Sequence, residues 1–261
     1  MKVLDLFSGI GGFSLGFEAA GMETVAFCEI EPYPQKILRQ HWSDVPIYED
    51  VKELTYEQLR KDGIGAVDVI CGGFPCTDIS QVGKQEGVND ETRSGLWSEC
   101  ARLLREIRPK YGVFENVTAL LSGDNGRWLQ RILWDISKIG YDAEWHCIPS
   151  SELGANHHRD RFWLITYPCR KRLQRRTEAR IFTEGRKNWD ELVTRCILDF
   201  REKRDVEPII HRVPHGIPKY MDRIKGLGNA ITPPIAEVIG RAIVEDNHVR
   251  EKTKALRTRT A

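Results

Sequence analysis

The sequence predicts an α/β protein built on a doubly wound sheet, in which parallel strands are covered by helices on both faces. Three observations support this prediction. Short apolar runs alternate with segments of helical periodicity through residues 1–166, and continuous apolar strands are typical of buried parallel sheets. A glycine-rich turn follows the first of these runs. The 261 residues suffice for one large domain and a small additional region.

The expected elements alternate along the chain, and each strand candidate is a short apolar run. The strand candidates are residues 3–7, 24–30, a short run near Ile47, 67–73, 111–117, 143–149 and 161–167. Helical periodicity marks the segments between most of them. The helix candidates are a segment ending at Ala20, then 32–42, 95–107, 127–140 and 233–246, with a frayed end after the last.

The alternation ends after residue 166, which divides the chain into three expected regions. Residues 1–166 form the sheet domain, 167–222 a small irregular region, and 223–261 a segment whose helix packs back on the sheet domain. Residues 1–166 carry 17 Lys/Arg and 25 Asp/Glu, whereas residues 167–261 carry 22 and 13. The basic second part indicates a polyanionic partner, although a solvated basic surface is the plainer alternative.

Composition excludes several classes of protein. No apolar stretch approaches the roughly 18 residues that a membrane span needs, and the first residues already read as strand and turn rather than as a signal peptide. Seven cysteines occur, none in Cys-x-x-Cys spacing. We therefore expect no disulfide framework and no metal site, and a cytoplasmic location.

The first turn and the ends of the next two strands carry residues suited to a nucleoside ligand. In DLFSGIGGF, Gly9, Gly11 and Gly12 allow a sharp turn and close approach of a ligand to the helix that follows. Glu29 ends the second strand, where it can bind both ribose hydroxyls, and Asp50 ends the third. The alternative is a plain glycine turn with two solvated acids. The glycine spacing is not G-x-G-x-x-G and no P-loop occurs, so a nucleoside without pyrophosphate is favoured.

A cysteine, a glutamate and two arginines form a second set of candidates. A lone cysteine is usually a buried small hydrophobe, but in GGFPCTDIS Pro75 fixes the approach to Cys76 and polar residues follow it, which favours a presented thiol. Glu115 ends the next strand and can face the same cleft. Arg159 and Arg161 are two residues apart at the start of a strand, so both point the same way. A capping glutamate and a basic strand edge are the alternatives.

Together these segments resemble the cytosine-5 DNA methyltransferases, particularly the bacterial and phage enzymes. DLFSGIGGF resembles the cofactor loop of that family, GGFPC its Pro-Cys nucleophile, ENV its catalytic glutamate and RDR its arginine pair. Glu29 and Asp50 fall where its cofactor-binding acids fall, and RIKGLGNAITPP resembles its closing element. The elements occur in family order over most of the chain. The resemblance implies a Rossmann-like, S-adenosylmethionine-dependent methyltransferase sheet.

The resemblance also implies that S-adenosylmethionine binds along the strand ends. The glycine turn lies near its methionine part, Glu29 holds its ribose, and Ile30 lies near its adenine. The residues expected to contact the cofactor are Phe7, Ser8, Gly9, Gly11, Gly12, Glu29, Ile30, Asp50, Val51, Pro75, Asn229 and Ala230.

The implied reaction gives a role to each of the second set of candidates, which are Cys76, Glu115, Arg159 and Arg161. The Cys76 thiolate adds to carbon 6 of cytosine while Glu115 protonates or hydrogen-bonds ring N3. Arg161 steadies the base at O2, and Arg159 orients neighbouring groups or a phosphate. The cytosine must be flipped out of duplex DNA, and residues 81–95 have the composition of a lid over it. We expect a monomer that binds double-stranded DNA and can be paired with a restriction endonuclease.

Two departures from the family pattern keep alternatives open. His157 stands where the arginine motif normally begins with glutamine, and the recognition region of residues 167–222 is short for the family. A reduced module that reads a short site or reads it weakly is the expectation. The alternatives are the same chemistry on transfer RNA, although no CFT element occurs, and a DNA-binding relative with weak or no catalysis.

Overall fold

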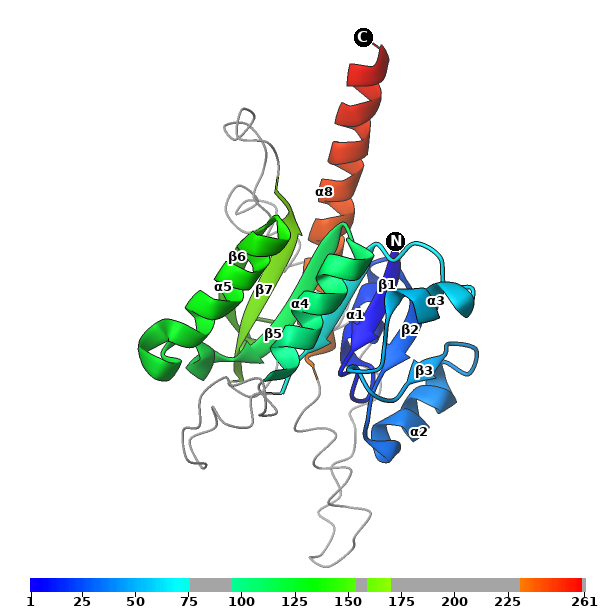
Figure 1. Cartoon of the computed structure of the whole chain (residues 1–261), viewed down its shortest axis with the longest axis vertical. Coiled ribbons are helices and arrows are strands. Elements are labelled where there is room, and N and C mark those ends of the chain that lie inside the picture. Colours follow the sequence, from blue (N-terminus) through cyan, green and yellow to red (C-terminus); the bar gives the residue numbers. More distant parts are fainter. Residues whose placement is uncertain (76–94, 154–158, 170–230, 260–261) are drawn as a thin grey trace, which may run out of the picture.

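The computed structural model describes residues 1–75, 95–153, 159–169 and 231–259 (Figure 1). Several predicted features lie outside these ranges. They are Cys76, the candidate lid, His157, the recognition region beyond residue 169, Asn229 and Ala230. The domain boundaries at residues 166 and 222 therefore stay a prediction.

The described strands form one seven-stranded sheet with the order β3-β2-β1-β4-β5-β7-β6. The five strands from β3 to β5 pair in parallel. This order, with helices on both sides, confirms the predicted α/β class. The strands are β1 (Lys2–Leu6), β2 (Glu23–Cys28), β3 (Ile47–Tyr48), β4 (Val69–Gly73), β5 (Tyr111–Val117), β6 (Tyr141–Pro149) and β7 (Asp160–Pro168).

The predicted parallel pairing does not extend to the last two strands, because β7 pairs antiparallel with both β5 and β6. Only residues 150–159 connect β6 to β7. A parallel pair needs a crossover connection of a dozen or more residues, whereas a short connection returns the chain antiparallel. The first residues of β7 therefore lie beside the carboxyl end of β5, since Arg161 pairs with Val117.

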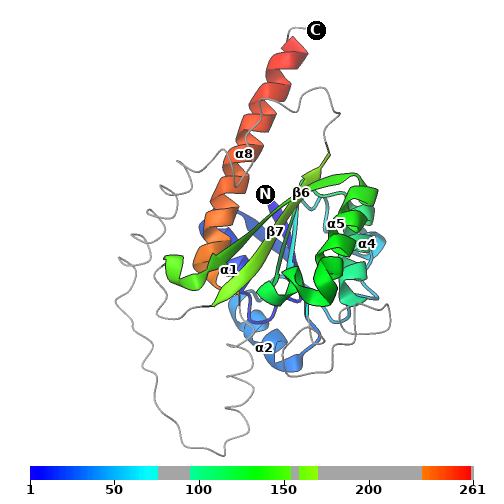
Figure 2. The same cartoon turned by 90° about the vertical axis from the view of Figure 1, so that its left-hand side faces the viewer.

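Helices cover both faces of the sheet, and side chains of the strands contribute to an apolar core on each face. Neighbouring residues on a strand point to opposite faces. Leu4 and Ile70 accordingly belong to one apolar cluster, which includes residues of α4 and α5, while Val3 and Val69 belong to the other, with α1 and α8. Figure 2 shows these two helix pairs on opposite sides of the sheet. The described helices are α1 (Gly12–Ala19), α2 (Pro32–His41), α3 (Tyr56–Lys61), α4 (Leu96–Ile107), α5 (Arg127–Ile139) and α8 (Pro233–Arg259), with short 3-10 turns at Thr118–Leu121, Gly123–Gly126 and Ser150–Leu153.

The first and last described helices pack together although they are far apart in sequence. Gly16 allows this approach, because an added Cβ there would lie 2.4 Å from the Pro233 carbonyl oxygen and 2.7 Å from the Cβ of Ala236. The apolar side chains Ile235 and Ile239 of α8 are fully buried in the cluster that α1 lines. The helix predicted at residues 233–246 continues to residue 259 and projects beyond the sheet (Figure 1).

Candidate active site

The candidate residues gather at one edge of the sheet, where the parallel strands end and β7 begins. Parallel strands bring their carboxyl ends to a common edge, and ligands of doubly wound sheets bind there. The glycine turn follows β1, Glu29 follows β2, Asp50 follows β3, and Glu115 lies near the end of β5. These residues form two groups, one on each side of β4, which lies between β1 and β5.

The turn after β1 has the unusual backbone that its glycines predict. Gly9 and Gly11 have φ of 53° and 87°, and Phe7 adopts a positive φ of 51°, a region costly for a residue with a side chain. Ser8 fastens the turn to β2. Its hydroxyl donates to the Asp5 carbonyl (2.6 Å) and accepts the Cys28 N–H (3.2 Å). Gly12, the first residue of α1, needs its hydrogen side chain because the Ile231 carbonyl oxygen would lie 2.6 Å from a Cβ there.

Glu29 is buried at the end of β2, and backbone groups hold its carboxylate. One oxygen accepts the Gly9 N–H at 2.7 Å and the other accepts the Glu31 N–H at 2.8 Å. Burial raises the pKa of Glu29, while these two hydrogen bonds act to lower it. The carboxylate therefore ties the glycine turn to the loop after β2. Its oxygens have lone pairs left for hydroxyl donors.

Ile30, which follows Glu29, has an aliphatic side chain and is 65% exposed. An apolar surface beside a carboxylate matches the two sides of a nucleoside, a flat base and a ribose with hydroxyls. Glycine at position 9 also leaves space, since a Cβ there would meet no atom within 4 Å. The residues present thus fit an adenosine-like group.

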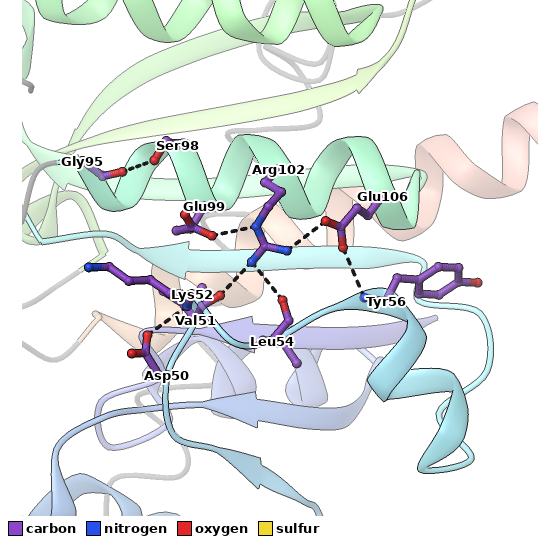
Figure 3. Close-up of polar contacts among 10 residues, drawn as sticks. All are labelled: Asp50, Val51, Lys52, Leu54, Tyr56, Gly95, Ser98, Glu99, Arg102 and Glu106. Carbon is purple, nitrogen blue, oxygen red and sulfur yellow. Dashed lines mark hydrogen bonds and ion pairs between the residues drawn. The ribbon is translucent and has the colours of Figure 1, made fainter. Parts of the chain in front are cut away.

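Asp50 and Val51 lie in the loop that follows β3. The Asp50 side chain is half-buried and accepts the Lys52 N–H at 2.9 Å, while Val51 is buried. Arg102, from α4, donates to the carbonyl oxygens of Val51 and Leu54 (Figure 3). Sequence reasoning did not identify Arg102. The only signal in the sequence is its helical spacing from Glu99 and Glu106.

Glu115 and Arg161 form an ion pair at the other side of the site. The distance from Arg161 Nε to Glu115 Oε1 is 2.8 Å, and both side chains are largely buried. Burial raises the pKa of Glu115 to about 7, although the charges of Arg161 and Arg159 act against the rise. Burial and the charge of Arg161 lower the pKa of Arg159. The structure thus brings three of the four predicted catalytic residues together, with a carboxyl group that changes protonation near neutral pH.

The segment that leads to Cys76 is fixed beside Glu115. Gly73 pairs with Glu115 across β4 and β5, and a Cβ on Gly73 would lie 3.1 Å from Glu115 Oε2. Asn116 Nδ2 donates to the Phe74 carbonyl at 3.1 Å. Pro75 is the last described residue before Cys76. Asn116 was not predicted from the sequence, although it lies in the ENV segment, because its partner is a backbone carbonyl oxygen that no sequence pattern marks.

Two further residues at this edge were not predicted. Ile231 follows Asn229 and Ala230 in the chain, and its atoms limit the space at both Gly12 and Gly73. Asp5 is fully buried in β1 and accepts the Ser14 hydroxyl at 2.7 Å. Burial raises the pKa of Asp5 to about 7. The sequence feature that marks Asp5 is an acidic residue inside the apolar run of residues 3–7.

The described residues show neither a metal-binding cluster nor a membrane-spanning helix. Within these ranges, no group of three or more His, Cys, Asp and Glu side chains could hold a metal ion. None of the described helices has the length and apolar character needed to cross a membrane.

Comparison with known proteins agrees with the geometry. M.DsaV, a type II methyltransferase from Dactylococcopsis salina, is 32% identical over 167 residues, which are 64% of this chain and 46% of that protein. M.Eco47II, a type II methyltransferase from Escherichia coli, is 41% identical over 140 residues, which are 53% and 32%. The chain spans less than half the length of these curated relatives. A solved Spodoptera frugiperda DNMT2 mutant shares the fold, with a TM-score of 0.62 at 14% identity over 93% of this chain and 99% of that one.

A family model also matches most of the chain. The model described as C-5 cytosine-specific DNA methylase covers residues 1–207. That range includes the glycine turn, both glutamates, the Pro-Cys segment and the arginine pair. The chain therefore belongs to the C-5 cytosine-specific DNA methylase family.

Proposed function

We propose that this chain transfers a methyl group from S-adenosylmethionine to carbon 5 of cytosine in double-stranded DNA. The observation that carries the proposal is the buried Glu115 carboxyl, paired with Arg161 and fixed beside the segment that leads to Cys76. Its pKa of about 7 allows it to be protonated at neutral pH.

The cofactor site is the group of residues around Glu29. Glu29 would accept the ribose hydroxyls, Ile30 would cover one face of adenine, and Asp50 and Val51 would border the base. Phe7 and Ser8, the glycines of the first turn, and Pro75, Asn229 and Ala230 complete the proposed set. Bound there, S-adenosylmethionine would supply an electrophilic methyl group on its sulfonium.

The residues of the chain prepare the cytosine for that methyl group. Carbon 5 of cytosine is a poor nucleophile until the ring loses its conjugation. The Cys76 thiolate forms a bond to carbon 6, and the electron pair displaced toward N3 is taken up by a proton from Glu115. The ring is then enamine-like, and carbon 5 would form a bond to the methyl carbon as the bond from that carbon to the sulfonium sulfur breaks, with S-adenosylhomocysteine as the leaving group.

The same residues release the product. A water molecule removes the proton from carbon 5, the bond between carbon 6 and the Cys76 sulfur breaks, and the ring regains its conjugation. Glu115 recovers its proton as N3 loses it. Arg161, held by Glu115 before substrate binds, would contact the cytosine O2, and Arg159 would orient a phosphate.

The substrate follows from the reaction and from the relatives. Carbons 5 and 6 cannot be reached inside a stacked duplex, so the cytosine must be flipped out. The curated relatives M.DsaV and M.Eco47II are named type II methyltransferases. We propose duplex DNA as the partner, and a bacterial or phage-infected cell, with pairing to an endonuclease, as the context. The net positive charge of residues 167–261 suits phosphate contacts.

The test is methyl transfer by the purified chain and by Cys76→Ser, with labelled S-adenosylmethionine and matched DNA and RNA. We expect label on DNA with the unmodified chain and none above background with Cys76→Ser. Cys169→Ser is the control, because Cys169 is exposed just past the opposite end of β7. Bisulfite sequencing of DNA from expressing cells would give the target site. Label on RNA alone, or full activity of Cys76→Ser, would overturn the proposal.

A further inference from the structure

A single arginine on α4 connects that helix to the loop after β3. Arg102 uses all three guanidinium nitrogens (Figure 3). Nε contacts Glu99 at 2.7 Å and Nη1 contacts Glu106 at 2.9 Å. Nη2 donates to the carbonyl oxygens of Val51 at 2.8 Å and Leu54 at 2.9 Å.

These contacts differ from those of an ordinary surface ion pair. The Arg102 side chain is 26% exposed, and its two glutamate partners are 21% and 34% exposed. The glutamates orient the planar guanidinium so that one nitrogen faces two carbonyl oxygens. A lysine could reach some of these acceptors but lacks the fixed fork that meets all four.

The loop that Arg102 holds has few other attachments to the sheet. The strand before it, β3, has two residues, and within the described part of the chain it pairs only with β2. Inside the loop, the Asp50 carbonyl accepts the N–H groups of Glu53 and Leu54, and the Asp50 carboxylate accepts the Lys52 N–H. These bonds shape the loop but do not place it. Placement comes from the buried Val51 and Leu54 side chains, from Arg102, and from Glu106 of α4, which accepts the Tyr56 N–H just after the loop at 3.3 Å.

We propose that Arg102 is a positioning residue for S-adenosylmethionine, which sets Asp50 and Val51 at the adenine end of the cofactor site. This inference rests on the proposed function, since it takes those two residues to border the base. Arg102 does not itself touch the cofactor. It acts through the carbonyl oxygen of Val51, which is adjacent in sequence to Asp50.

The experiment compares Arg102→Ala and Arg102→Lys with the unmodified chain. Calorimetry measures the Kd for S-adenosylhomocysteine, and steady-state assays measure kcat and the KM values for S-adenosylmethionine and DNA. In Arg102→Ala we expect the Kd and the cofactor KM to rise about tenfold, as for loss of a single hydrogen bond at the cofactor. The kcat at saturating cofactor and the KM for DNA stay within about twofold. Arg102→Lys gives an intermediate rise.

The matched control is Arg131→Ala on α5. Arg131 also pairs with a carboxylate four residues along its helix, Asp135, but its side chain is 60% exposed. We expect it to leave the cofactor Kd unchanged. Circular dichroism and thermal unfolding of each variant report the fold, and Arg102→Lys serves if Arg102→Ala does not fold.

Two results would overturn the inference. Unchanged cofactor affinity in folded Arg102 variants would show that the loop is held without the arginine. Equal losses in kcat, in the KM for DNA and in cofactor affinity would show a general structural role. Failure of the proposed function is distinct, because it shows as absence of label on DNA with the unmodified chain, whatever the Arg102 variants do to the Kd for S-adenosylhomocysteine.

Discussion

Glu29 and Glu115 occupy similar places on the two sides of the site but are held in different ways. Each is a buried glutamate at the carboxyl end of a parallel strand, and burial raises the pKa of each. Backbone N–H groups of Gly9 and Glu31 hold Glu29, whereas the guanidinium of Arg161 holds Glu115.

The difference suits two roles, a fixed hydrogen-bond acceptor at Glu29 and a proton donor at Glu115. Peptide N–H groups cannot leave without moving two loops, so Glu29 is a fixed acceptor, as a ribose site requires. A side-chain partner can turn away when a substrate arrives, so Glu115 can exchange partners and protons. Proton transfer at neutral pH is favoured when the pKa lies near the working pH, and the pKa of Glu115 is about 7.

Glu115→Gln is the variant expected to have the largest effect. Glutamine keeps the shape but cannot give a proton to N3, so we expect methyl transfer to fall by roughly 10²–10⁴-fold. The Kd for S-adenosylhomocysteine should stay within about twofold. Rates under single-turnover conditions measure the first quantity and calorimetry the second. A variant that keeps its rate would show that the two glutamates do not differ in the proposed way.

Glu29→Gln should reverse that pattern with a smaller effect. One of the two N–H groups loses its acceptor, because the amide has a single oxygen, and the ribose hydroxyls lose a charged partner. We expect the Kd for S-adenosylhomocysteine to rise by about 10–100-fold, since hydrogen bonds to charged groups contribute about 1.5–3 kcal/mol. The rate at saturating cofactor should change little. Loss of rate without loss of affinity would contradict the division between the two sides.

Asp5→Asn sharpens the comparison through a third buried carboxyl at the same edge. The folded state holds the Asp5 proton up to about pH 7, whereas the unfolded state releases it near the ordinary value of 3.8. The contribution of Asp5 to stability is therefore present in full below about pH 4 and is lost as pH rises to about 7. The Asp5→Asn variant has no carboxyl group at this position, so its stability does not show this fall as pH rises.

Urea unfolding at pH 5 and pH 8 measures the effect of Asp5→Asn. The stability of the variant relative to the unmodified chain should increase by about 2 kcal/mol between these pH values. Asp44→Asn is the control, because Asp44 is exposed before β3. An equal pH dependence in both variants would mean that Asp5 does not titrate in this range.

The sequence predicted the parallel part of the fold because its signals are local. Each buried strand is a short apolar run, and the positive φ values of Gly9 and Gly11 match the glycine turn. The direction of β7 was not predictable in the same way, since a strand buried on both faces reads alike in either direction. The short α3 was missed, because six residues carry little periodicity.

The candidate site was predicted where residue type reveals chemistry. Glu115 and Arg161 were named from motifs, and the structure pairs them. Arg102 could not be found, because its important partners are the carbonyl oxygens of Val51 and Leu54. Every residue has a carbonyl oxygen, so no sequence pattern marks which ones a distant arginine will bind. The catalytic role of Cys76 stays a prediction.

The packing of α8 on α1 has a consequence for synthesis of the protein. Phe13 and Phe17 emerge from the ribosome early, yet part of their cover is Ile235 and Ile239, more than two hundred residues later. At roughly 5–20 residues per second, that apolar face waits on the order of ten seconds or more for its partner. The nascent chain therefore cannot complete the packing of its first βα unit until α8 has been translated, and chaperones have that interval in which to bind it.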